Sequence, residues 1–500
     1  MNTGAPFPSV DGAQERVLHF QRKLHEWASD DAERRFHDLW NLVCDPATLV
    51  VAWSRVSRNR GSRTAGVDAA TRRHVEARGV DQFLTELREE LRAGTFRPLP
   101  VRERLIPKRD GKTYRRLGIP ALRDRVCQMA LKLVMEPIFE SGFYPSSYAY
   151  RPGRRCQDAI AEIHLFTSRG YQWIVETDIE ACFDQLPHCL IGDEVRRRIA
   201  DKRVLWLVRQ FLKAGIMTET GRLERTVTGT PQGGIASPLL ANIALSALDR
   251  QYEADWQEMS RYDGRRQFLQ RTGRPTYRLC RYADDLVLLV WGDRQQAQAL
   301  LDQLAQRVQA LGLKLKAEKT TLTHIDEGFV FLGQRIVRRH HGPKPYVYTF
   351  VSNESLGSIR RKVKALTGRS TTNMELSELL AALNRKLRGW ANYFRHAAAK
   401  RTFVYLGYYA WWRVGRWLRK KHPRLTWKQI NRRYASDGNF HAKGIALFNP
   451  GSVSVTRYRF RGSKIPTPWN EQHADPTSPR AQRGRYVEQR TLERVQQALA

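Results

Sequence analysis

The spacing of hydrophobic residues predicts helices at the start of the chain and a β-hairpin after them. From residue 15 to about residue 94 apolar positions recur at helical spacing, apart from a turn-rich, basic stretch at residues 58–68. Residues 102–120 then alternate between apolar and polar, with Asp110 and Gly111 in the middle. An Asp-Gly pair between two alternating segments is typical of a tight hairpin turn. We therefore predict a helical N-terminal region followed by a hairpin that carries Lys and Arg.

The middle of the chain alternates between helical and strand-like segments. We predict short apolar strands at residues 172–177, 277–281, 286–290 and 328–336, and helices at residues 122–139, 204–213, 239–248 and 295–311. Ser237 and Pro238 suit the N-cap and the first position of the third of these helices. Residues 250–276 lack clear periodicity, and residues 338–345 and 367–373 are typical of connecting segments. Beyond them the pattern is mainly helical and basic.

The charge balance indicates a polyanionic partner. The 500 residues contain 85 Lys and Arg against 50 Asp and Glu, which gives a net charge of +35. Nucleic acid is the default partner of so basic a chain. An acidic membrane surface is the rival, but no apolar run approaches the roughly 20 residues that span a bilayer. Because the N-terminus also lacks the pattern of a targeting segment, we expect a cytoplasmic or nucleoid-associated protein of several packed units.

Three aspartates stand where predicted strands end. Asp178 follows the first predicted strand, and Asp284 and Asp285 join the next two. If these strands share one sheet, the three carboxylates meet at one edge, where adjacent like charges require a cation. Oxygen ligands suit Mg²⁺, and a pair of such ions serves phosphoryl transfer from a nucleoside triphosphate. Ordinary turn chemistry is the alternative explanation of an Asp-Asp pair.

A basic, aromatic region follows in the last third of the chain. Residues 384–433 contain fifteen Lys or Arg, eleven Phe, Tyr or Trp, and no Asp or Glu. Helical spacing places one set of apolar residues on one face: Leu383, Leu387, Trp390, Ala391 and Phe394. Arg385, Arg388 and Arg395 fall on another face. We therefore predict a helix that packs through its apolar face and contacts nucleic-acid phosphates through these arginines, with most of the aromatic residues in the core.

Several segments, in the same order, resemble the boxes of reverse transcriptases. Arg-Tyr-Ala-Asp-Asp-Leu-Val at residues 281–287 resembles the Tyr-x-Asp-Asp box, and residues 177–184 resemble the box of the first aspartate. The Pro-Gln-Gly segment at residues 230–238 resembles the box between them. Residues 106–108 and 115–120 are similar to the motifs before these boxes, and Phe-Leu-Gly at residues 331–333 to the motif after them.

Three further segments indicate one branch of that family. Residues 387–394 resemble the maturase segment that grips intron RNA, while residues 59–68 and 150–153 fit the approach to the polymerase core in the same branch. Retroviral polymerases are poorer matches. The chain therefore resembles the group II intron-encoded proteins, which are reverse transcriptases with a maturase domain.

The resemblance implies an α+β fold of the right-hand polymerase type: fingers, a palm with an antiparallel sheet, and a helical thumb, preceded by a helical N-terminal extension. The implied boundaries are the extension leading into the fingers at residues 1–100, fingers at 101–170, palm with the catalytic aspartates at 171–350, thumb or maturase domain at 351–435, and a basic DNA-binding segment or partly disordered tail at 436–500.

The same resemblance implies the roles of individual residues. Asp178, Asp284 and Asp285 would hold two Mg²⁺ ions and act in catalysis, and the backbone oxygen of Ile179 would contribute to the metal site. Lys319 is a candidate proton donor to pyrophosphate, although a solvated lysine is the simpler explanation.

Four other residues would bind the incoming nucleotide. Lys108 and Arg115 would neutralise the triphosphate. Phe183 corresponds to the bulky residue that collides with a ribose 2′-hydroxyl, and Gln232 would contact the nucleotide from the glycine loop. The family often has proline after the matching arginine. This chain has Arg116 there, and we assign the phosphate contact to Arg115.

The implied function is that of an RNA-directed DNA polymerase and maturase in the bacterial cytoplasm. It would bind group II intron RNA, assist splicing, and copy the intron into DNA at a target site from deoxynucleoside triphosphates. A related reverse transcriptase recruited to host defence or DNA repair, and a non-enzymatic RNA-binding splicing cofactor, are alternatives. A nucleotide cyclase would account for the carboxylates but not for the glycine loop or the basic region.

Cysteine and histidine positions argue against a zinc module and a nuclease. The six cysteines form no Cys-x-x-Cys pair, so neither a zinc site nor a disulfide framework is predicted. Many relatives end in a His-Asn-His nuclease supported by paired cysteines. Residues 436–500 contain no cysteine and only His441 and His473, so we predict no nuclease there.

Overall fold

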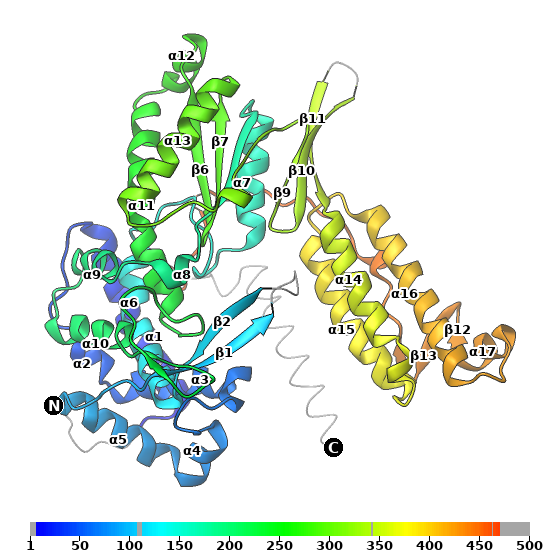
Figure 1. Cartoon of the computed structure of the whole chain (residues 1–500), viewed down its shortest axis with the longest axis horizontal. Coiled ribbons are helices and arrows are strands. Elements are labelled where there is room, and N and C mark those ends of the chain that lie inside the picture. Colours follow the sequence, from blue (N-terminus) through cyan, green and yellow to red (C-terminus); the bar gives the residue numbers. More distant parts are fainter. Residues whose placement is uncertain (1–6, 108–112, 342–343, 463, 471–500) are drawn as a thin grey trace, which may run out of the picture.

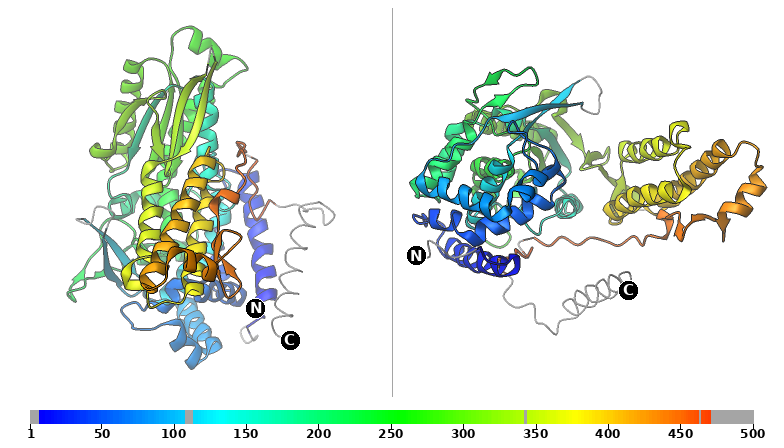
Figure 2. Two further views of the ribbon diagram at one scale, coloured as in Figure 1. Left: turned by 90° about the vertical axis from the view of Figure 1, so that its right-hand side faces the viewer. Right: turned by 90° about the horizontal axis from the view of Figure 1, so that it is seen from below.

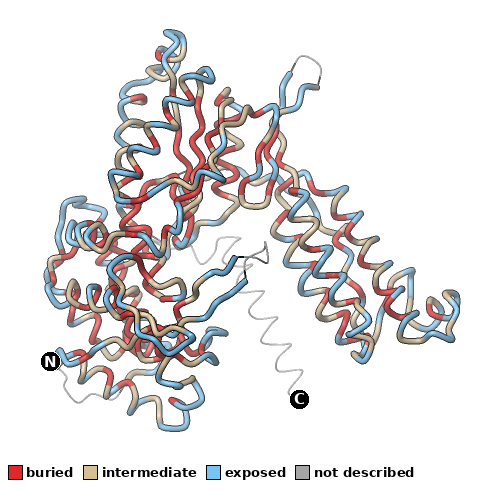
Figure 3. Tube along the Cα trace, in the orientation of Figure 1, coloured by how far each residue is buried: buried red, intermediate tan, exposed pale blue. Residues whose placement is uncertain are grey.

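The computed structural model describes residues 7–107, 113–341, 344–462 and 464–470. The chain forms a large body, residues 7–351, and a helical arm, residues 352–452, which extends from one side of the body (Figure 1). A last segment, residues 453–470, runs from the arm back to the body, and we call it the strap (Figure 2). Buried residues form separate cores in the body and in the arm (Figure 3).

The N-terminal part is helical, as predicted. α1 (Val10–Asp30) starts at the N-cap Ser9, whose side chain accepts a hydrogen bond from Gly12 N, and α3 (Pro46–Arg58) starts at Asp45 in the same manner. Both pack with α6 (Leu122–Glu140) in the body core. The shorter helices are α2 (Trp40–Val43), η1 (Arg60–Arg63), α4 (Arg72–Arg78) and α5 (Val80–Ala93). The basic stretch at residues 58–68 therefore includes one 3-10 turn.

The predicted hairpin is confirmed. β1 (Val101–Pro107) and β2 (Tyr114–Ile119) pair antiparallel from Arg102 opposite Ile119 to Pro107 opposite Tyr114. Asp110 and Gly111 of the predicted turn lie outside the described residues. β4 (Ile216–Met217) pairs parallel with β1, and β5 (Leu223–Glu224) completes this sheet. The hairpin extends from the body toward the side on which the arm lies (Figure 1).

A four-stranded sheet forms the centre of the body, with strand order β6-β7-β3-β8. Its strands are β3 (Trp173–Asp178), β6 (Thr276–Tyr282), β7 (Asp285–Trp291) and β8 (Thr321–His324). Successive side chains of β7 enter different cores because strand side chains alternate between faces. Leu286 and Leu288 pack with the large body core, whereas Val287 and Leu289 pack with α7 in a second core. Burial on both faces explains the unbroken apolar run of this strand.

Helices pack on both faces of the sheet: α7 (Cys156–Ser168) on one face, and α11 (Ser237–Met259) and α13 (Arg294–Ala310) on the other, with α12 (Arg265–Arg271) beside β6. The remaining helices of this part, α8 (Cys182–Gln185), α9 (His188–Arg196) and α10 (Lys202–Leu212), extend the body beyond the sheet. The N-cap of α11 is Ala236, one residue before the predicted position. Ser237 Oγ instead donates to Pro231 O at 2.9 Å and accepts from Thr230 Oγ1 at 2.8 Å. Much of residues 250–276, which showed no periodicity, is helical in α11 and α12.

The prediction for residues 328–345 was partly wrong. A single strand was expected at 328–336 and a connection at 338–345, but the chain forms β9 (Phe329–Phe331), β10 (Gln334–His341) and β11 (Lys344–Val351). The turn between β9 and β10 uses positive φ angles at Leu332 (48°) and Gly333 (75°). β10 pairs with both neighbours. Strand pairing, rather than local hydrophobicity, therefore defines this sheet.

The arm contains α14 (Asn353–Leu366), α15 (Leu376–Phe394), α16 (Lys400–Lys421) and α17 (Trp427–Tyr434), and the short 3-10 turns η3 (Arg369–Thr371) and η4 (Pro450–Ser452). The strands β12 (Ala435–Ser436), β13 (Asn439–Ala442) and β14 (Ile445–Ala446) form a small sheet at its end. Leu383 and Leu387 of α15 pack on Leu406 and Trp417 of α16, all fully buried. The predicted apolar face of α15 is confirmed.

The strap lies within residues 436–500, for which a DNA-binding segment or partly disordered tail was expected, and it contacts the body. Within its described part, Arg461 and Tyr458 bond the buried carboxylate of Asp158 on α7. Farther on, Trp469 is buried against α1, where its indole N–H donates to Gln21 Oε1 at 3.3 Å. The strap therefore ties the arm to two helices of the body. Residues 471–500, including His473, lie outside the described residues.

Among the described helices, none combines the length and the apolar character needed to cross a membrane.

Candidate active site

The central sheet brings the three predicted aspartates to one edge. Asp178 ends β3 and Asp285 begins β7, and the antiparallel register places their Cα atoms opposite each other. Asp284 precedes Asp285 in the turn from β6, which needs a positive φ of 60° at Ala283. Ile179 N donates to Asp284 O at 3.2 Å, so this backbone segment also belongs to the edge. The predicted convergence of the three carboxylates is therefore present.

A buried arginine beneath the turn holds its shape. Arg281 is fully buried, and its guanidinium donates to both carboxylate oxygens of Asp249 on α11, at 2.8 and 2.5 Å. It also donates to Asn242 Oδ1 at 3.0 Å and to Ala283 O at 3.1 Å. The carbonyl directly before Asp284 is thus anchored to a helix of the body. Sequence analysis assigned no role to this arginine.

Burial and mutual repulsion disfavour negative charge on the carboxylates. Burial, then the charges of Asp178 and Asp284, raise the pKa of Asp285 to about 6. Burial, then the charge of Asp178, also raises the pKa of Asp284. Asp178 Oδ1 is buried without a hydrogen-bond partner among the described residues. The site therefore has more negative charge than its surroundings neutralise.

Lys319 supplies one positive charge at this edge. Its ammonium donates to Asp178 Oδ2, while the side chain stays exposed to solvent, so the lysine is both solvated and paired with the carboxylate. Burial lowers the pKa of Lys319, but the hydrogen bond and charge of Asp178 outweigh burial and raise it. Asp284 and Asp285 keep raised pKa values in spite of this cation.

The donor set fits a divalent cation. The described residues contain no group of three or more His, Cys, Asp or Glu side chains already arranged around a metal position. The oxygens of Asp178, Asp284 and Asp285 are nevertheless hard ligands at one edge, one of them unpartnered, in a site with unneutralised charge. Cations of the Mg²⁺ type prefer such oxygens and need few protein ligands.

An aromatic pair lies beside the carboxylate edge. Phe183 of α8 is half-buried, and the ring of Tyr150 meets it edge to face with centroids 6.2 Å apart. Tyr150 is about half exposed and has a positive φ of 59°. Burial, then the negative charge of Asp284, raises the pKa of the Tyr150 phenol, which places this hydroxyl near the carboxylates. Sequence analysis noted the segment of Tyr150 as a family pattern but did not identify the tyrosine as a site residue.

The glycine loop joins the β1–β2 hairpin to the aromatic pair. Gly118 N donates to Gln232 O at 2.8 Å, and Thr230 N donates to Phe183 O at 2.7 Å. Gly233 has a φ of 122°, and a Cβ there would lie only 2.5 Å from Gly118 O. Only glycine therefore fits this close approach of the backbone. The side chain of Gln232 donates to Asp184 Oδ2 at 3.2 Å, one residue after Phe183.

The two neighbouring arginines of β2 have different environments. Arg116 forms ion pairs with Glu103 and Glu224, so its charge is neutralised within the sheet. Arg115 is exposed on the opposite face of the strand, and its charge acts on both Asp284 and Tyr150. This arrangement supports the choice of Arg115 over Arg116 for contacts at the site. Lys108 lies outside the described residues.

A groove links the carboxylate edge to the arm. A cavity of about 770 Å³ is lined by Asp178, Asp285 and Lys319 on one side and by α14 and α15 of the arm on the other. The β9–β10 turn, with Leu332 and Gly333, forms part of its wall. Tyr393 of α15 donates to Leu332 O at 2.8 Å, which joins the arm to this turn. A polymer end lying against the arm would thus reach the carboxylates.

The three predicted RNA-binding arginines are not equivalent. Arg385 and Arg388 are exposed and line one cavity on α15 together with Asn384 and Asn392. The guanidinium of Arg388 also lies 5.0 Å from the centroid of the Phe448 ring. Arg395 is the C-cap of α15 and is only half-exposed, with a buried Nε that has no hydrogen-bond partner among the described residues. The predicted basic surface therefore consists of Arg385 and Arg388.

Comparison with known proteins identifies the class. Residues 106–336 match the family described as reverse transcriptase (RNA-dependent DNA polymerase), and residues 356–435 match the group II intron maturase-specific domain. The chain belongs to the family of group II intron-encoded reverse transcriptases and maturases. By class it is an RNA-directed DNA polymerase with a right-hand polymerase-like fold, and polymerases of this class use divalent metal ions and act on nucleic acid.

Individual relatives agree with this assignment. The chain is 37% identical over 342 residues to Protein YkfC of Escherichia coli, covering 65% of this chain and 89% of that protein. It is 30% identical over 364 residues to the group II intron-encoded protein LtrA of Lactococcus lactis, and this match covers 64% of this chain and 60% of LtrA. Nuclear intron maturase 2 of Arabidopsis thaliana is 26% identical over 278 residues, covering 43% of this chain and 38% of that protein.

Proposed function

We propose that this protein binds group II intron RNA, assists its splicing, and copies it into DNA at a target site in retrohoming. The observation that supports this most directly is the meeting of Asp178, Asp284 and Asp285 at an edge that opens into a groove against the maturase domain. The test is to supply purified protein with an RNA template, a DNA primer, deoxynucleotides and Mg²⁺, and separately with precursor RNA in a splicing assay. A protein that extends primers but neither binds nor splices intron RNA would instead support a host role.

We assign the parts of a right hand as follows. The β1–β2 hairpin within residues 101–170 serves as fingers, the central sheet within 171–350 as palm, and α14–α16 within 351–435 as thumb. Residues 1–100 form the helical extension that leads into the fingers. The groove between the carboxylate edge and α15 supports this division, because primer and template must lie between palm and thumb. We expect the protein to be located with the nucleic acids on which it acts, the intron RNA and the target DNA.

We assign two Mg²⁺ ions to the oxygens of Asp178, Asp284 and Asp285 and the backbone oxygen of Ile179. When bound, such ions activate the attacking hydroxyl and neutralise the triphosphate.

Side chains of the protein position the reacting groups. Arg281 holds the turn that carries Asp284, and Arg115 on β2 supplies positive charge for the phosphates. Gln232 would contact the nucleotide. To Lys319, whose ammonium contacts Asp178, we assign the proton that the leaving pyrophosphate takes up.

A pH prediction follows from the raised pKa of Asp285. Its folded pKa of about 6 exceeds the ordinary value of 3.8, so its stabilising contribution is complete below about pH 4 and is lost as the pH rises through about 6. A bound cation offsets that loss and must displace a proton at low pH. We therefore expect Mg²⁺ to raise the Tm less at about pH 5 than at about pH 7.5. Asp285→Asn should remove most of this difference, and an equal Mg²⁺ effect at both pH values would contradict the assignment.

Replacing Phe183 should relax the choice of sugar. We assign its ring, supported by Tyr150, to the position that a ribose 2′-hydroxyl would have to enter. Phe183→Ala should raise ribonucleotide incorporation relative to deoxynucleotide incorporation by about two orders of magnitude, the effect of removing a steric clash of roughly 3 kcal/mol. The measurement is kcat/KM for matched ribo- and deoxynucleotides. Phe268→Ala, at an exposed site on α12, is the control. Unchanged discrimination would remove Phe183 from the sugar pocket.

We assign RNA phosphate contacts to Arg385 and Arg388 and a weaker role to Arg395, in line with their exposure. The double variant Arg385→Gln with Arg388→Gln should lower the slope of log affinity against log salt by about 1.4–1.8, because each phosphate contact contributes about 0.7–0.9. The measurement is binding of a structured intron RNA across a salt series. Gln at the exposed Arg271 and Arg274 of the body is the matched control. An unchanged slope in a folded double variant would place the RNA elsewhere.

A further inference from the structure

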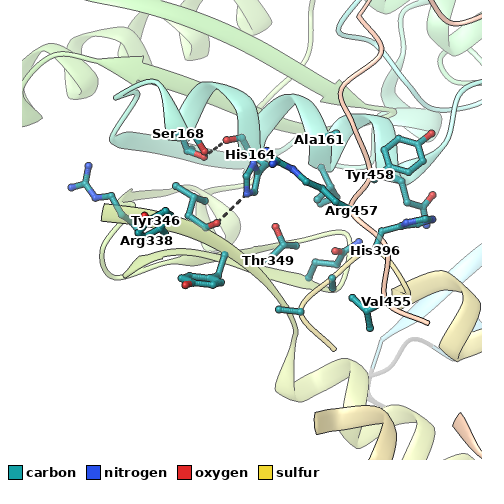
Figure 4. Close-up of a pocket in the computed structure, with 18 of the residues that line it drawn as sticks. Ala161, His164, Ser168, Arg338, Tyr346, Thr349, His396, Val455, Arg457 and Tyr458 are labelled. Atoms are coloured by element: carbon teal, nitrogen blue, oxygen red, sulfur yellow. Dashed lines mark hydrogen bonds between the residues drawn. The ribbon is translucent and has the colours of Figure 1, made fainter. Parts of the chain in front are cut away.

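A pocket away from the catalytic groove lies where two segments of the body and the strap meet residues 396–398 of the arm. Its volume is about 710 Å³, and its walls are α7, the β10–β11 hairpin and the strap (Figure 4). It shares no lining residue with the groove at the carboxylates, although Gln334 of this pocket directly follows Gly333 of the groove in the chain. Pockets of roughly 300–1,000 Å³ suit small organic groups. The strap completes this pocket, because Val455, Arg457 and Tyr458 form one wall.

The charges of the pocket select an anion. None of its described lining residues is acidic, whereas Arg338, Arg457, His164 and His396 all contribute to it. Arg338 is neutralised by an ion pair with Asp326. Arg457 is exposed and has no hydrogen bond or ion pair to another described residue. Its side chain runs toward His164 (Figure 4). One uncompensated guanidinium therefore remains for a ligand.

The uncharged walls of the pocket favour a ligand that carries a flat organic group as well as a negative charge. Ile160, Ala161 and Ala397 provide apolar surface, and the rings of Tyr346 and Tyr458 stand at opposite walls, on the hairpin and on the strap. His164 Nε2 already bonds Val347 O at 3.0 Å, and burial, which outweighs that bond, lowers its pKa, so this histidine is neutral at pH 7. An inorganic phosphate would use Arg457 but leave the aromatic and apolar walls without contacts.

We propose that this pocket binds one unpaired nucleotide of a single-stranded RNA, with its phosphate on Arg457 and its base against Tyr346 or Tyr458. Aromatic and arginine side chains are the usual partners of bases turned out of an RNA strand. A base that is paired and stacked within a helix is not free to enter the pocket. The strand, rather than a free nucleotide, is favoured because two further exposed arginines lie close in sequence to lining residues, Arg339 after Arg338 and Arg459 after Tyr458, and would contact neighbouring phosphates.

The proposal assigns the strap a second use besides joining the arm to the body. Thr456 N donates to Arg395 O at the end of α15, and Arg461 bonds Asp158 on α7, so Arg457 is held between two anchors. RNA in the pocket would thus touch the arm, the strap and the body at once. The proposal concerns binding only and does not depend on polymerase activity or on the metal site.

The test is photo-crosslinking of a short single-stranded RNA that contains 4-thiouridine, with mass spectrometry to locate the modified peptides. We expect crosslinks on the peptides of Tyr346 or Tyr458. Arg457→Gln should lower them about tenfold, the loss typical of one charge-assisted hydrogen bond. Arg271→Gln is the control for charge, and crosslinks on the arm serve as the internal standard in every variant.

A second pair of variants separates the pocket from the general charge of the strap. Val455→Glu places a carboxylate in the acid-free pocket, whereas Ser454→Glu makes the same charge change at an adjacent exposed residue that does not line it. Only Val455→Glu should abolish the pocket crosslinks. Absence of these crosslinks in the wild type, or equal loss in both variants, would overturn the proposal.

Two competitors distinguish the sources of the nucleotide. Unlabelled single-stranded RNA should remove the pocket crosslinks, while the same sequence as a duplex should not. AMP at the same nucleotide concentration should have little effect. If AMP displaces the RNA equally well, the pocket takes a free nucleotide and the assignment to an RNA strand is wrong. If the wild type fails the primer-extension test but shows the pocket crosslinks, the proposed polymerase function fails while this inference stands.

Discussion

Asp284→Asn should abolish Mg²⁺-dependent primer extension while leaving RNA binding intact. The substitution keeps the shape of the side chain but removes a negative charge from an edge where, in our assignment, two cations must be held. Loss of one such ligand is expected to cost about 4 kcal/mol of transition-state stabilisation, which corresponds to a rate lower by on the order of 10³-fold. RNA binding is expected to be unchanged because the arm does not depend on this turn.

The measurement is single-nucleotide extension of a DNA primer on an RNA template, beside a binding assay with intron RNA. Asp302→Asn, on the exposed surface of α13, makes the same chemical change away from the edge and should extend normally. Near-normal extension by Asp284→Asn would remove Asp284 from the metal site. Loss of both extension and RNA binding would show that the variant damages the fold rather than the chemistry.

Arg281→Met should destabilise the body strongly, although Arg281 is not in direct contact with any proposed ligand. The guanidinium is fully buried and is bonded to Asp249, Asn242 and Ala283 O. Its removal leaves the buried Asp249 carboxylate without its cation, which typically costs about 3–5 kcal/mol. For a unit of this size that cost corresponds to a fall in Tm of roughly 10 °C.

A second substitution tests this explanation. Arg281→Met combined with Asp249→Leu replaces the ion pair by apolar side chains and should recover much of the lost stability. Primer extension should remain impaired in the double variant, because Ala283 O still lacks the donor that holds the turn before Asp284. Arg78→Met, which breaks an exposed pair with Glu86, should change stability by no more than about 1 kcal/mol. A double variant as unstable as the single one would contradict the role of the unpaired carboxylate.

The strands and the order of the motifs were predictable because their signals are local. The Asp-Gly pair in an alternating segment indicated the β1–β2 hairpin, and the apolar run before Asp178 indicated β3. β10 beyond residue 336 and the whole of β11 were not predicted. β10 carries three arginines, whereas β11 is mostly aromatic and β-branched, a composition typical of strands that the connecting segment expected at residues 338–345 overlooked. Their backbone groups are satisfied by pairing with each other and, for β10, with β9. Pairing partners of this kind are not visible in the residues themselves.

In the candidate site, too, residues in local motifs were predictable from the sequence, whereas contacts between distant segments were not. The identities of Asp178, Asp284 and Asp285 followed from the sequence, because a motif is a local pattern. The ammonium of Lys319 on Asp178, 141 residues away in the chain, and the ring of Tyr150 on Phe183 did not follow, because each needs the folded sheet to bring distant segments together. The unequal exposure of Arg385, Arg388 and Arg395 depended on where α15 ends and on which segments cover it.

The sequence by itself determined the class of chemistry and the nature of the partner. Three carboxylates at strand ends and a net charge of +35 are properties of residue types and short spacings. Tertiary structure decided which cation contacts those carboxylates, which arginines stay exposed, and that the strap returns to bury Trp469 against α1. Those outcomes depend on burial and on contacts between segments hundreds of residues apart. A contact of that kind has no local pattern, because its free energy arises only when both segments leave water together.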